Sequence, residues 1–207
     1  MSRRTPAFVF GVDLDGVVAD FYGGMRPVAA EWTGRNLADL PLDVSYGLDE
    51  WGIGRNRYPD LHRFAVVQRD LFRQLAPIPG APQALRRLSE SGVRIRIITH
   101  RLFLEHIHER TITQTVAWLD HHGVPYWDLC FMKDKAAVGA DLYIDDSPDN
   151  LKALVEDSQA VVAFTNSTNR TLDVPLRAGD WSEVESIVRE RMAVYLAHGE
   201  AHRLAGR

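Results

Sequence analysis

Two aspartates that directly follow an apolar run are the residues of this chain best suited to chemistry. Asp13 and Asp15 come after the segment Phe8–Val12 and are followed at once by Gly16. Side chains two positions apart on an extended segment point the same way, so both carboxylates would face one ligand. Two acids held this close repel each other and favour a bound metal ion, while the glycine lets the backbone turn away sharply. The segment therefore predicts a metal-assisted reaction site at the end of a strand.

Three later positions supply the remaining groups of such a site. Thr99 ends another apolar run, and its hydroxyl, with backbone N–H groups at a following helix N-terminus, would hold phosphate oxygens beside His100. Lys135 adds a cation that would hold phosphate and nucleophile together, and the pair Asp145 and Asp146 would complete a magnesium site. The order of acid pair, hydroxyl, lysine and acid pair, each at a strand end, predicts chemistry on a phosphate.

The elements that must position these groups indicate an α/β fold. Five short runs have the continuous apolar character of strands that are buried on both faces. Amphipathic helical patterns lie between them, and the alternation of strand and helix predicts a Rossmann-like parallel sheet. The expected strands are Phe8–Val12, Ile95–Ile98, Asp128–Phe131, Leu142–Ile144 and Ala160–Phe164; the expected helices include Pro82–Ser91, with Leu85 and Leu88 inward, and Thr111–Asp120, with Ile112, Val116 and Leu119 inward.

The stretch between the first two strands, about residues 20–79, is far longer than one crossover helix needs. We expect it to be a mostly helical cap, with helices at Gly23–Trp32 and Leu61–Leu75 around a glycine-rich segment at 47–54. Residues 1–19 and 80–207 would then form the catalytic core.

The last part of the chain reads as one helix. Asp180 is the expected N-cap, because Glu183 stands three residues later as a capping box requires. We expect this helix to end near Ala197 and residues 198–207 to fray.

The composition of the chain argues against a nucleic-acid polymer or a membrane as its partner. The 207 residues are 45% hydrophobic and carry a formal charge of −4, so no overall basic surface would attract a nucleic-acid polymer or a membrane. Cys130 is the only cysteine, which rules out an internal disulfide and indicates a buried strand thiol in a reducing cytoplasm. The pair Arg3 and Arg4 resembles part of an export signal, but the apolar run after it is too short. Trp118, Trp127 and Trp181 are expected in the core.

These motifs resemble those of the haloacid dehalogenase-like phosphatases, with Asp13-x-Asp15, Thr99, Lys135 and Asp145-Asp146 as the four motifs. Within that superfamily the chain is most similar to the 5′(3′)-deoxyribonucleotidases of cytosolic and mitochondrial type C. Lys135 stands ten residues before Asp145, as the family pattern requires, so Lys133 would be peripheral. The segments that carry the similarity are residues 13–24, 75–81 and 134–146.

The resemblance implies a mechanism. Asp13 would be the nucleophile and Asp15 the general acid and base, and Thr99 with Lys135 would stabilise charge on the phosphate. Mg²⁺ would be held by Asp13, the backbone carbonyl of Asp15, and one of the pair at 145 and 146, where the family favours the second.

The same resemblance suggests a substrate. The protein would dephosphorylate (deoxy)nucleoside monophosphates, and the rings of Phe21, Trp51 and Phe72 would contact the base.

The chain also departs from the family. His100 and Arg101 stand where its nucleotidases commonly have Ser-Pro, and residues 47–57 match only loosely. A phosphatase for sugar phosphates or another small metabolite therefore stays open as an alternative. A non-enzymatic phospho-receiver module is a more distant one, because its acidic pair precedes its acceptor and it has no insert. The oligomeric state is open, with a homodimer among the candidates.

Overall fold

The computed structural model describes the backbone of residues 7–205 and the side chains of residues 7–198. Its centre is a six-stranded sheet in the order β3-β2-β1-β4-β5-β6, and every neighbouring pair of strands is parallel. The predicted α/β parallel-sheet class is confirmed. The strands are β1 (Val9–Val12), β2 (Arg94–Thr99), β3 (Asp128–Phe131), β4 (Leu142–Asp145), β5 (Val161–Phe164) and β6 (Leu176–Ala178).

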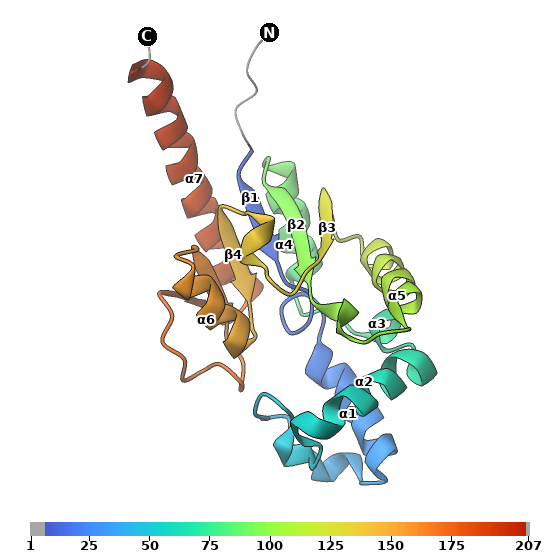
Figure 1. The fold of residues 1–207 in the computed structure, drawn as a ribbon. Coiled ribbons are helices and arrows are strands. Elements are labelled where there is room, and N and C mark those ends of the chain that lie inside the picture. Colours follow the sequence, from blue (N-terminus) through green and yellow to red (C-terminus); the bar gives the residue numbers. More distant parts are fainter. Residues whose placement is uncertain (1–6, 206–207) are drawn as a thin grey trace.

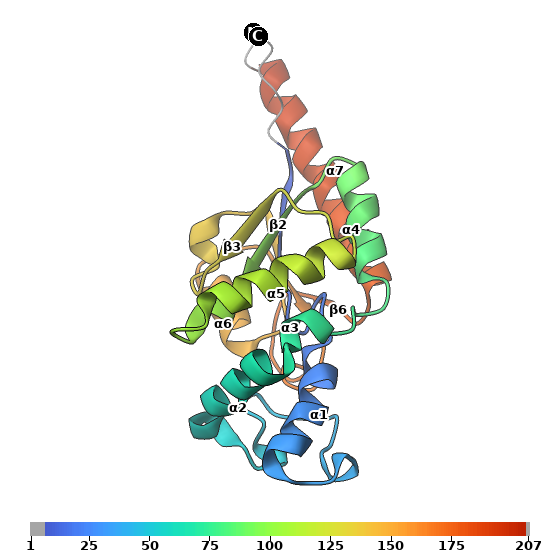
Figure 2. The same cartoon turned by 90° about the vertical axis from the view of Figure 1, so that its right-hand side faces the viewer.

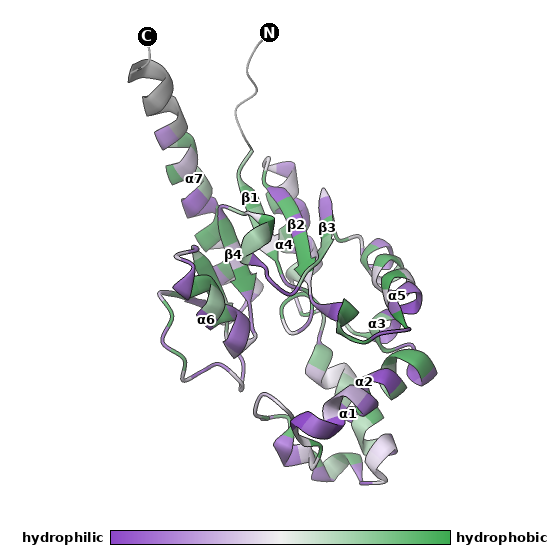
Figure 3. Cartoon of the chain, in the orientation of Figure 1, coloured by the Kyte–Doolittle hydropathy of each residue, from purple (hydrophilic) through white to green (hydrophobic). Residues whose placement is uncertain are grey.

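Helices cover both faces of the sheet. One apolar cluster joins β1 and β2 to α4 (Ala81–Glu90), α5 (His108–His121) and α7 (Trp181–Ala205). A second cluster joins β4 and β5 to α6 (Pro148–Glu156), with η4 (Ala136–Val138) at its margin. Figure 2 shows α4 and α7 on one side of the sheet and α6 on the other. The central strands are the most hydrophobic part of the molecule in Figure 3, as burial on both faces requires.

The long insert lies beyond the carboxyl ends of the strands, at the bottom of Figure 1. Its elements are α1 (Phe21–Thr33), η1 (Leu37–Asp39), η2 (Asp49–Trp51), α2 (Gly54–Arg69) and α3 (Leu71–Gln74). The chain leaves and re-enters the sheet layer at one place, because Ala19 pairs with Pro77 and the N–H of Asp20 donates to Ala76 O at 2.8 Å. The division into a core and a cap of residues 20–79 stays a prediction.

One predicted cap helix is wrong in its bounds. The segment Leu61–Leu75 is not a single helix, because α2 begins earlier and ends at Arg69. Asp70 has a left-handed backbone (φ 46°), a conformation that Asp tolerates better than most residues, and α3 starts after it.

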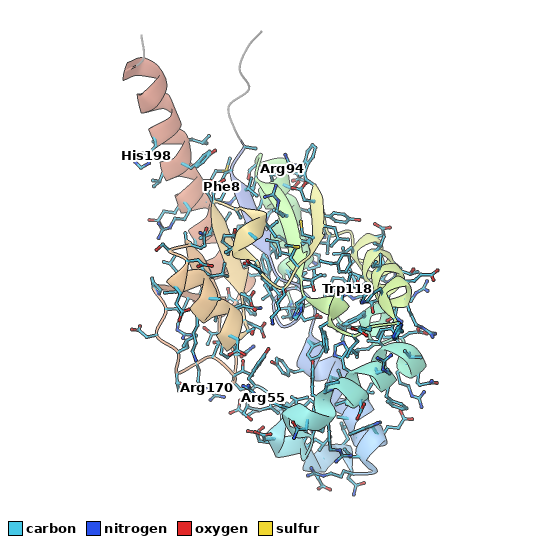
Figure 4. The ribbon with its side chains drawn as sticks, viewed as in Figure 1. Phe8, Arg55, Arg94, Trp118, Arg170 and His198 are labelled. Atoms are coloured by element: carbon cyan, nitrogen blue, oxygen red, sulfur yellow. The ribbon has the colours of Figure 1, made fainter. Side chains whose placement is uncertain are left out.

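One prediction of an inward-facing residue is also wrong. Ile112 is exposed on α5, and the buried side of that helix carries Thr111, Gln114 and Thr115 beside Trp118. The Gln114 amide nitrogen donates to Val66 O and the Thr115 hydroxyl donates to Thr111 O, which lets these two polar side chains stand where hydropathy would place Ile112. Trp118, labelled in Figure 4, is buried as predicted.

The edge of the sheet explains the other errors of burial. Trp127 is 71% exposed, and Cys130 is half-buried rather than buried. Both lie at β3, which among the described strands has only β2 as a neighbour. An edge strand presents one side to solvent, and a short apolar run in the sequence does not reveal that position. Trp181 is buried, as predicted.

The C-terminal helix was predicted with a correct start and a wrong end. Asp180 Oδ1 accepts from the N–H groups of Ser182 and Glu183, at 2.8 and 2.9 Å, and Glu183 reaches back to Gly179 N. Helix α7 continues to Ala205 instead of ending near Ala197, through a segment rich in strong helix formers. The sixth strand was not predicted. Arg3, Arg4 and residues 206–207 lie outside the described residues.

Candidate active site

The site is built at the point where the order of the strands reverses, between β1 and β4, which is where open parallel sheets bind ligands. Asp13 follows β1 directly, and the next residues form a tight turn in which the N–H groups of Val18 and Ala19 donate to Leu14 O. Gly16 has φ +80°, and a Cβ there would overlap the carboxylate of Asp146. The turn therefore requires glycine and brings β1 against the end of β4.

Lys135 links the two strand ends. Its Nζ lies 2.7 Å from Asp13 Oδ1 and 2.6 Å from Asp145 Oδ2, with all three side chains buried. The two carboxylates raise the pKa of Lys135 against the opposing effect of burial. Lys135 is thus a fixed positive charge beside Asp13. Lys133, by contrast, is exposed.

Three buried acids share this place. Asp13, Asp145 and Asp146 each offer an oxygen within 4.8 Å of the others'. Burial raises the pKa of Asp13 to about 7, helped by the charges of Asp145 and Asp15 and opposed by Lys135. Burial and the same crowding raise the pKa of Asp146 well above its usual range. A set of oxygen donors that repel one another this strongly fits a hard divalent cation.

The members of the second acid pair differ in how their oxygens are used. Asp145 accepts from Lys135, from Ser147 N at 2.9 Å and from Asn150 Nδ2 at 3.2 Å. Asp146 accepts from Asn166 Nδ2 at 2.7 Å through one oxygen only. Asp146 therefore has more free capacity for a cation than Asp145. The Asp15 side chain is not part of this group of acids.

Asp15 is held by a residue that the sequence analysis assigned no role. Arg101, which opens η3 (Arg101–Phe103), donates from Nη2 to Asp15 Oδ1 at 2.6 Å and from Nε to Oδ2 at 2.9 Å. The Arg101 side chain is 1% exposed, whereas that of Asp15 is 24% exposed. Asp15 and the nearly buried Arg101 thus both lie on the cavity wall, with the arginine holding the carboxylate.

Thr99 and His100 reach the same place from β2. The Oγ1 of Thr99 is buried and has no hydrogen-bond partner among the described residues. Partial burial, with the charges of Lys133 and Lys135, lowers the pKa of His100. The prediction that an α-helix N-terminus directly follows Thr99 is wrong, because in the described chain the short η3 comes next and α5 starts only at His108.

These groups line a cavity of about 280 Å³, which includes Asp13, Asp15, Thr99, Lys135 and Asp146. Aromatic rings line it as well, and a second cavity of about 190 Å³ shares four of those rings with it. The shared rings are Phe21, Tyr22, Tyr46 and Tyr58.

Two of the three predicted base-contacting aromatics do not reach this cavity. Trp51 is 1% exposed and donates from Nε1 to Pro41 O at 2.8 Å, within the insert. Phe72 is fully buried, and its ring lies under the guanidinium of Arg101, 4.0 Å from the ring centroid. Both predictions are wrong because the insert needs an apolar core of its own, and large aromatic side chains fill it. Phe21 does line both cavities.

Comparison with known proteins agrees with this geometry. A sequence model of the family described as 5′ nucleotidase, deoxy (Pyrimidine), cytosolic type C protein matches residues 7–193. The chain belongs to this family. It is 54% identical over 190 residues to a protein of Chlorobaculum tepidum named "Putative 5′(3′)-deoxyribonucleotidase", covering 91% of this chain and 93% of that one. It is 31% identical over 189 residues to the human "5′(3′)-deoxyribonucleotidase, mitochondrial", covering 84% and 80%.

A solved structure shows the fold of this deoxyribonucleotidase-family chain. A haloacid dehalogenase-superfamily hydrolase, subfamily IA, from Geobacter sulfurreducens superposes with a TM-score of 0.56 at 16% identity, covering 88% of this chain and all of that one. The predicted resemblance and the predicted enzyme class, a phosphatase, are confirmed. None of the described helices is long and apolar enough to cross a membrane.

Several polar residues of the site were missed from the sequence. Asn166 and Asn169 follow β5 and hold Asp146, through its carboxylate and its backbone carbonyl respectively. Asn150 and Arg101 hold Asp145 and Asp15. A signal did exist for the two asparagines, because they stand after a strand end like the recognised motifs. Arg101 directly follows the Thr99 motif in the same way.

Proposed function

We propose that this family member is a magnesium-dependent phosphatase that hydrolyses (deoxy)nucleoside monophosphates through a phosphorylated Asp13. The observation that carries the proposal is the position of Asp13, which lies beside Lys135 and two further acids and lines a cavity that aromatic rings also line. The names of its relatives support the same class of substrate.

In the first half of the reaction, a carboxylate oxygen of Asp13 bonds to phosphorus and the P–O bond to the leaving group breaks. Asp15 gives its proton to the departing oxygen, as a general acid. Lys135 offsets the repulsion between the carboxylate and the phosphate, which amounts to about 4 kcal/mol per charge pair at 4 Å and an effective dielectric near 20. Thr99 would donate its free hydroxyl to a phosphate oxygen.

In the second half, water attacks phosphorus and the bond to Asp13 breaks. Asp15, now ionised, accepts the proton of the water. Asp13 and inorganic phosphate are released, so the two halves divide one difficult displacement into two easier ones.

Mg²⁺ would be held by Asp13, Asp146 and the backbone carbonyl of Asp15, and it would supply charge neutralisation for the phosphate oxygens. Asp146 is preferred over Asp145 as the direct ligand because the oxygens of Asp145 already accept from three donors. Burial, together with the charges of the neighbouring acids, raises the pKa values of Asp13 and Asp146, and a bound cation would offset both effects.

Three buried polar atoms around the cavity support a ligand with oxygen atoms. Thr99 Oγ1, Ser147 Oγ and His62 Nε2 lack hydrogen-bond partners among the described residues, and all three side chains line the cavity. Buried polar groups without partners are rare in folded proteins. Phosphate and sugar oxygens would satisfy them, while the rings shared by the two cavities would stack on the base. We place this reaction in the cytoplasm.

The test is a substrate panel. Purified protein with Mg²⁺ is assayed against deoxynucleoside 5′- and 3′-monophosphates and against sugar phosphates, with and without EDTA. We expect kcat/KM for the best nucleotide to exceed that for the best sugar phosphate by about tenfold or more, as stacking of one base would give, and EDTA to abolish turnover. A preference for sugar phosphates would reject the nucleotide assignment, and undiminished activity in EDTA would reject the metal.

A further inference from the structure

Arg101 is the buried charged residue whose contacts are not explained by the proposed chemistry. Its three nitrogens all have partners, since Nε and Nη2 donate to Asp15 and Nη1 donates to Thr115 Oγ1 at 3.0 Å. One face of the guanidinium lies on the ring of Phe72, 4.0 Å from its centroid. A buried guanidinium with this many partners is held in a single orientation.

The hydroxyl of Thr115 is itself held in one orientation. It donates to Thr111 O at 2.7 Å inside α5, so its hydrogen is committed and its lone pair is turned to Arg101. The partners of Arg101 therefore come from three places: the turn after β1, helix α5 of the core, and helix α3 of the insert.

We propose that Arg101 is the positioning residue for Asp15, and that Thr115 and Phe72 fix Arg101 in turn. The inference rests on the proposed role of Asp15 as the acid and base. Side-on pairing leaves Asp15 no freedom to rotate away from the cavity, while its 24% exposed side chain keeps oxygen surface for the substrate. The group that gives a proton in the first half of the reaction and accepts one in the second is then held in one position.

An arginine can hold the Asp15 carboxylate in a way that a lysine cannot. A lysine would supply the charge but only a single point of contact, so it would not fix the plane of the carboxylate. Displacement of a catalytic group by about 1 Å costs on the order of 100-fold in rate. Loss of Arg101 should therefore be felt in the steps that use Asp15 and not in the binding of phosphate.

The experiment compares substrates that differ in their need for an acid. Rapid-mixing kinetics are measured for Arg101→Met, Arg101→Lys and Asp15→Asn with a nucleoside monophosphate and with p-nitrophenyl phosphate, whose leaving group departs without a proton. For Arg101→Met we expect nucleotide kcat to fall about 30- to 100-fold, KM to change less than about threefold, and the first-turnover release of p-nitrophenol to fall less than about fivefold. Arg101→Lys should recover only a minor part of the nucleotide rate.

Coupling to Asp15 separates positioning from general support of the fold. In the Asp15→Asn background, Arg101→Met should add less than about threefold, because residues that act as a unit are not additive. Full additivity would overturn the proposal. So would equal losses of first-turnover rate on both substrates, or a rise in KM with unchanged kcat, which would make Arg101 a substrate-binding residue.

Two further measurements cover failure of the main variant. Thr115→Val removes the acceptor for Nη1, together with the hydroxyl's own hydrogen bond to Thr111 O, and should lower nucleotide kcat in the same pattern by roughly three- to tenfold. No change would overturn the part of the proposal in which Thr115 fixes Arg101. A crystal structure of the Arg101→Met protein should show the Asp15 carboxylate displaced, and an unmoved Asp15 would overturn the proposal whatever the activity. If the wild-type protein had no phosphatase activity, the proposed function would be wrong. The crystal structure of Arg101→Met would still decide whether Arg101 positions Asp15.

Discussion

The Nζ of Lys135 lies 2.7 Å from Oδ1 of Asp13, inside a pocket where both side chains are less than a tenth exposed. The ammonium group is placed where repulsion between nucleophile and phosphate is greatest. A buried cation in contact with two carboxylates also holds the ends of β1 and β4 together. Its loss should therefore be expressed in both rate and stability.

Lys135→Met should lower kcat/KM by about 100- to 1,000-fold, the usual effect of removing one preorganised electrostatic partner. Breaking the buried pair should also reduce the free energy of unfolding by about 3 kcal/mol, measured by urea denaturation. Lys133→Met is the matched control, since that lysine lies two residues away and is exposed. If Lys133→Met were as impaired as Lys135→Met, the assignment of this electrostatic role to Lys135 alone would be wrong.

Asp13→Asn should abolish turnover, to below a few per cent of wild type, while the fold remains intact. The amide should also stabilise the metal-free protein at high pH. Since the folded pKa of Asp13 is raised from 3.8 to about 7, wild-type stability is fully present below about pH 4 and falls as pH rises through 7. Melting temperatures without metal should thus be higher for the variant at pH 8 and similar at pH 4. Equal melting temperatures at pH 8 would show that the buried charge carries no cost.

Gly16→Ala tests the turn that joins the two acid pairs. The new Cβ would overlap the Asp146 carboxylate, and φ is +80°. We expect a destabilisation of about 1–3 kcal/mol and at least a tenfold loss of Mg²⁺ affinity, as displacement of a ligand or its support causes. Gly34→Ala has a similar φ of +68° and meets nothing within 4 Å, so it should lose stability alone. Normal magnesium binding by the Gly16 variant would separate the turn from the metal site.

The main groups of the site could be predicted because each stands at the end of an apolar run. In a parallel sheet the carboxyl ends of neighbouring strands share one edge, so Asp13, Thr99, Lys135 and Asp145 come together by topology alone. No knowledge of side-chain packing was needed. The same rule, applied to β5, would have pointed to Asn166.

The errors arise where packing between distant segments decides. Phe72 and Arg101 are 29 positions apart in the sequence, and nothing local shows that one ring lies under the other's guanidinium. The buried polar face of α5 depends on partners in the insert, such as Val66 O for Gln114. The exposure of Trp127 depends on β3 being an edge strand, which only the assembled sheet reveals.

His62 should make the stability of this protein sensitive to mild acid. It is buried among aromatic rings, and burial lowers its pKa to about 4, with Asp15 opposing and Arg101 assisting. The unfolded chain binds a proton near pH 6.5, so the contribution of His62 is present above that pH and is lost as pH falls toward 4.

The measurement is urea denaturation at pH 7 and pH 5. Between these values wild type should lose about 2 kcal/mol more than a His62→Phe variant, which keeps a ring in the cluster but has no titrating group. The expected change is a loss of wild-type stability on going from pH 7 to pH 5. A variant that loses as much stability as wild type would mean that the imidazole is already protonated in the folded protein, or hydrated there.

Phe21→Ala should distinguish a nucleotide phosphatase from one that ignores the base. Phe21 is 7% exposed, lines both cavities, and stacks on His62 with a centroid separation of 6.0 Å. Stacking of a base on an aromatic ring contributes about 1–3 kcal/mol, so KM for a deoxynucleoside monophosphate should rise about tenfold or more. p-Nitrophenyl phosphate, whose ring is directly bonded to the ester oxygen and carries no base, should be affected much less. Trp127→Ala, which removes an exposed ring outside the cavity, should change neither substrate. Equal losses on both substrates in the Phe21 variant would mean that this ring supports the fold, and a small phosphorylated metabolite would then be the better substrate class for the site.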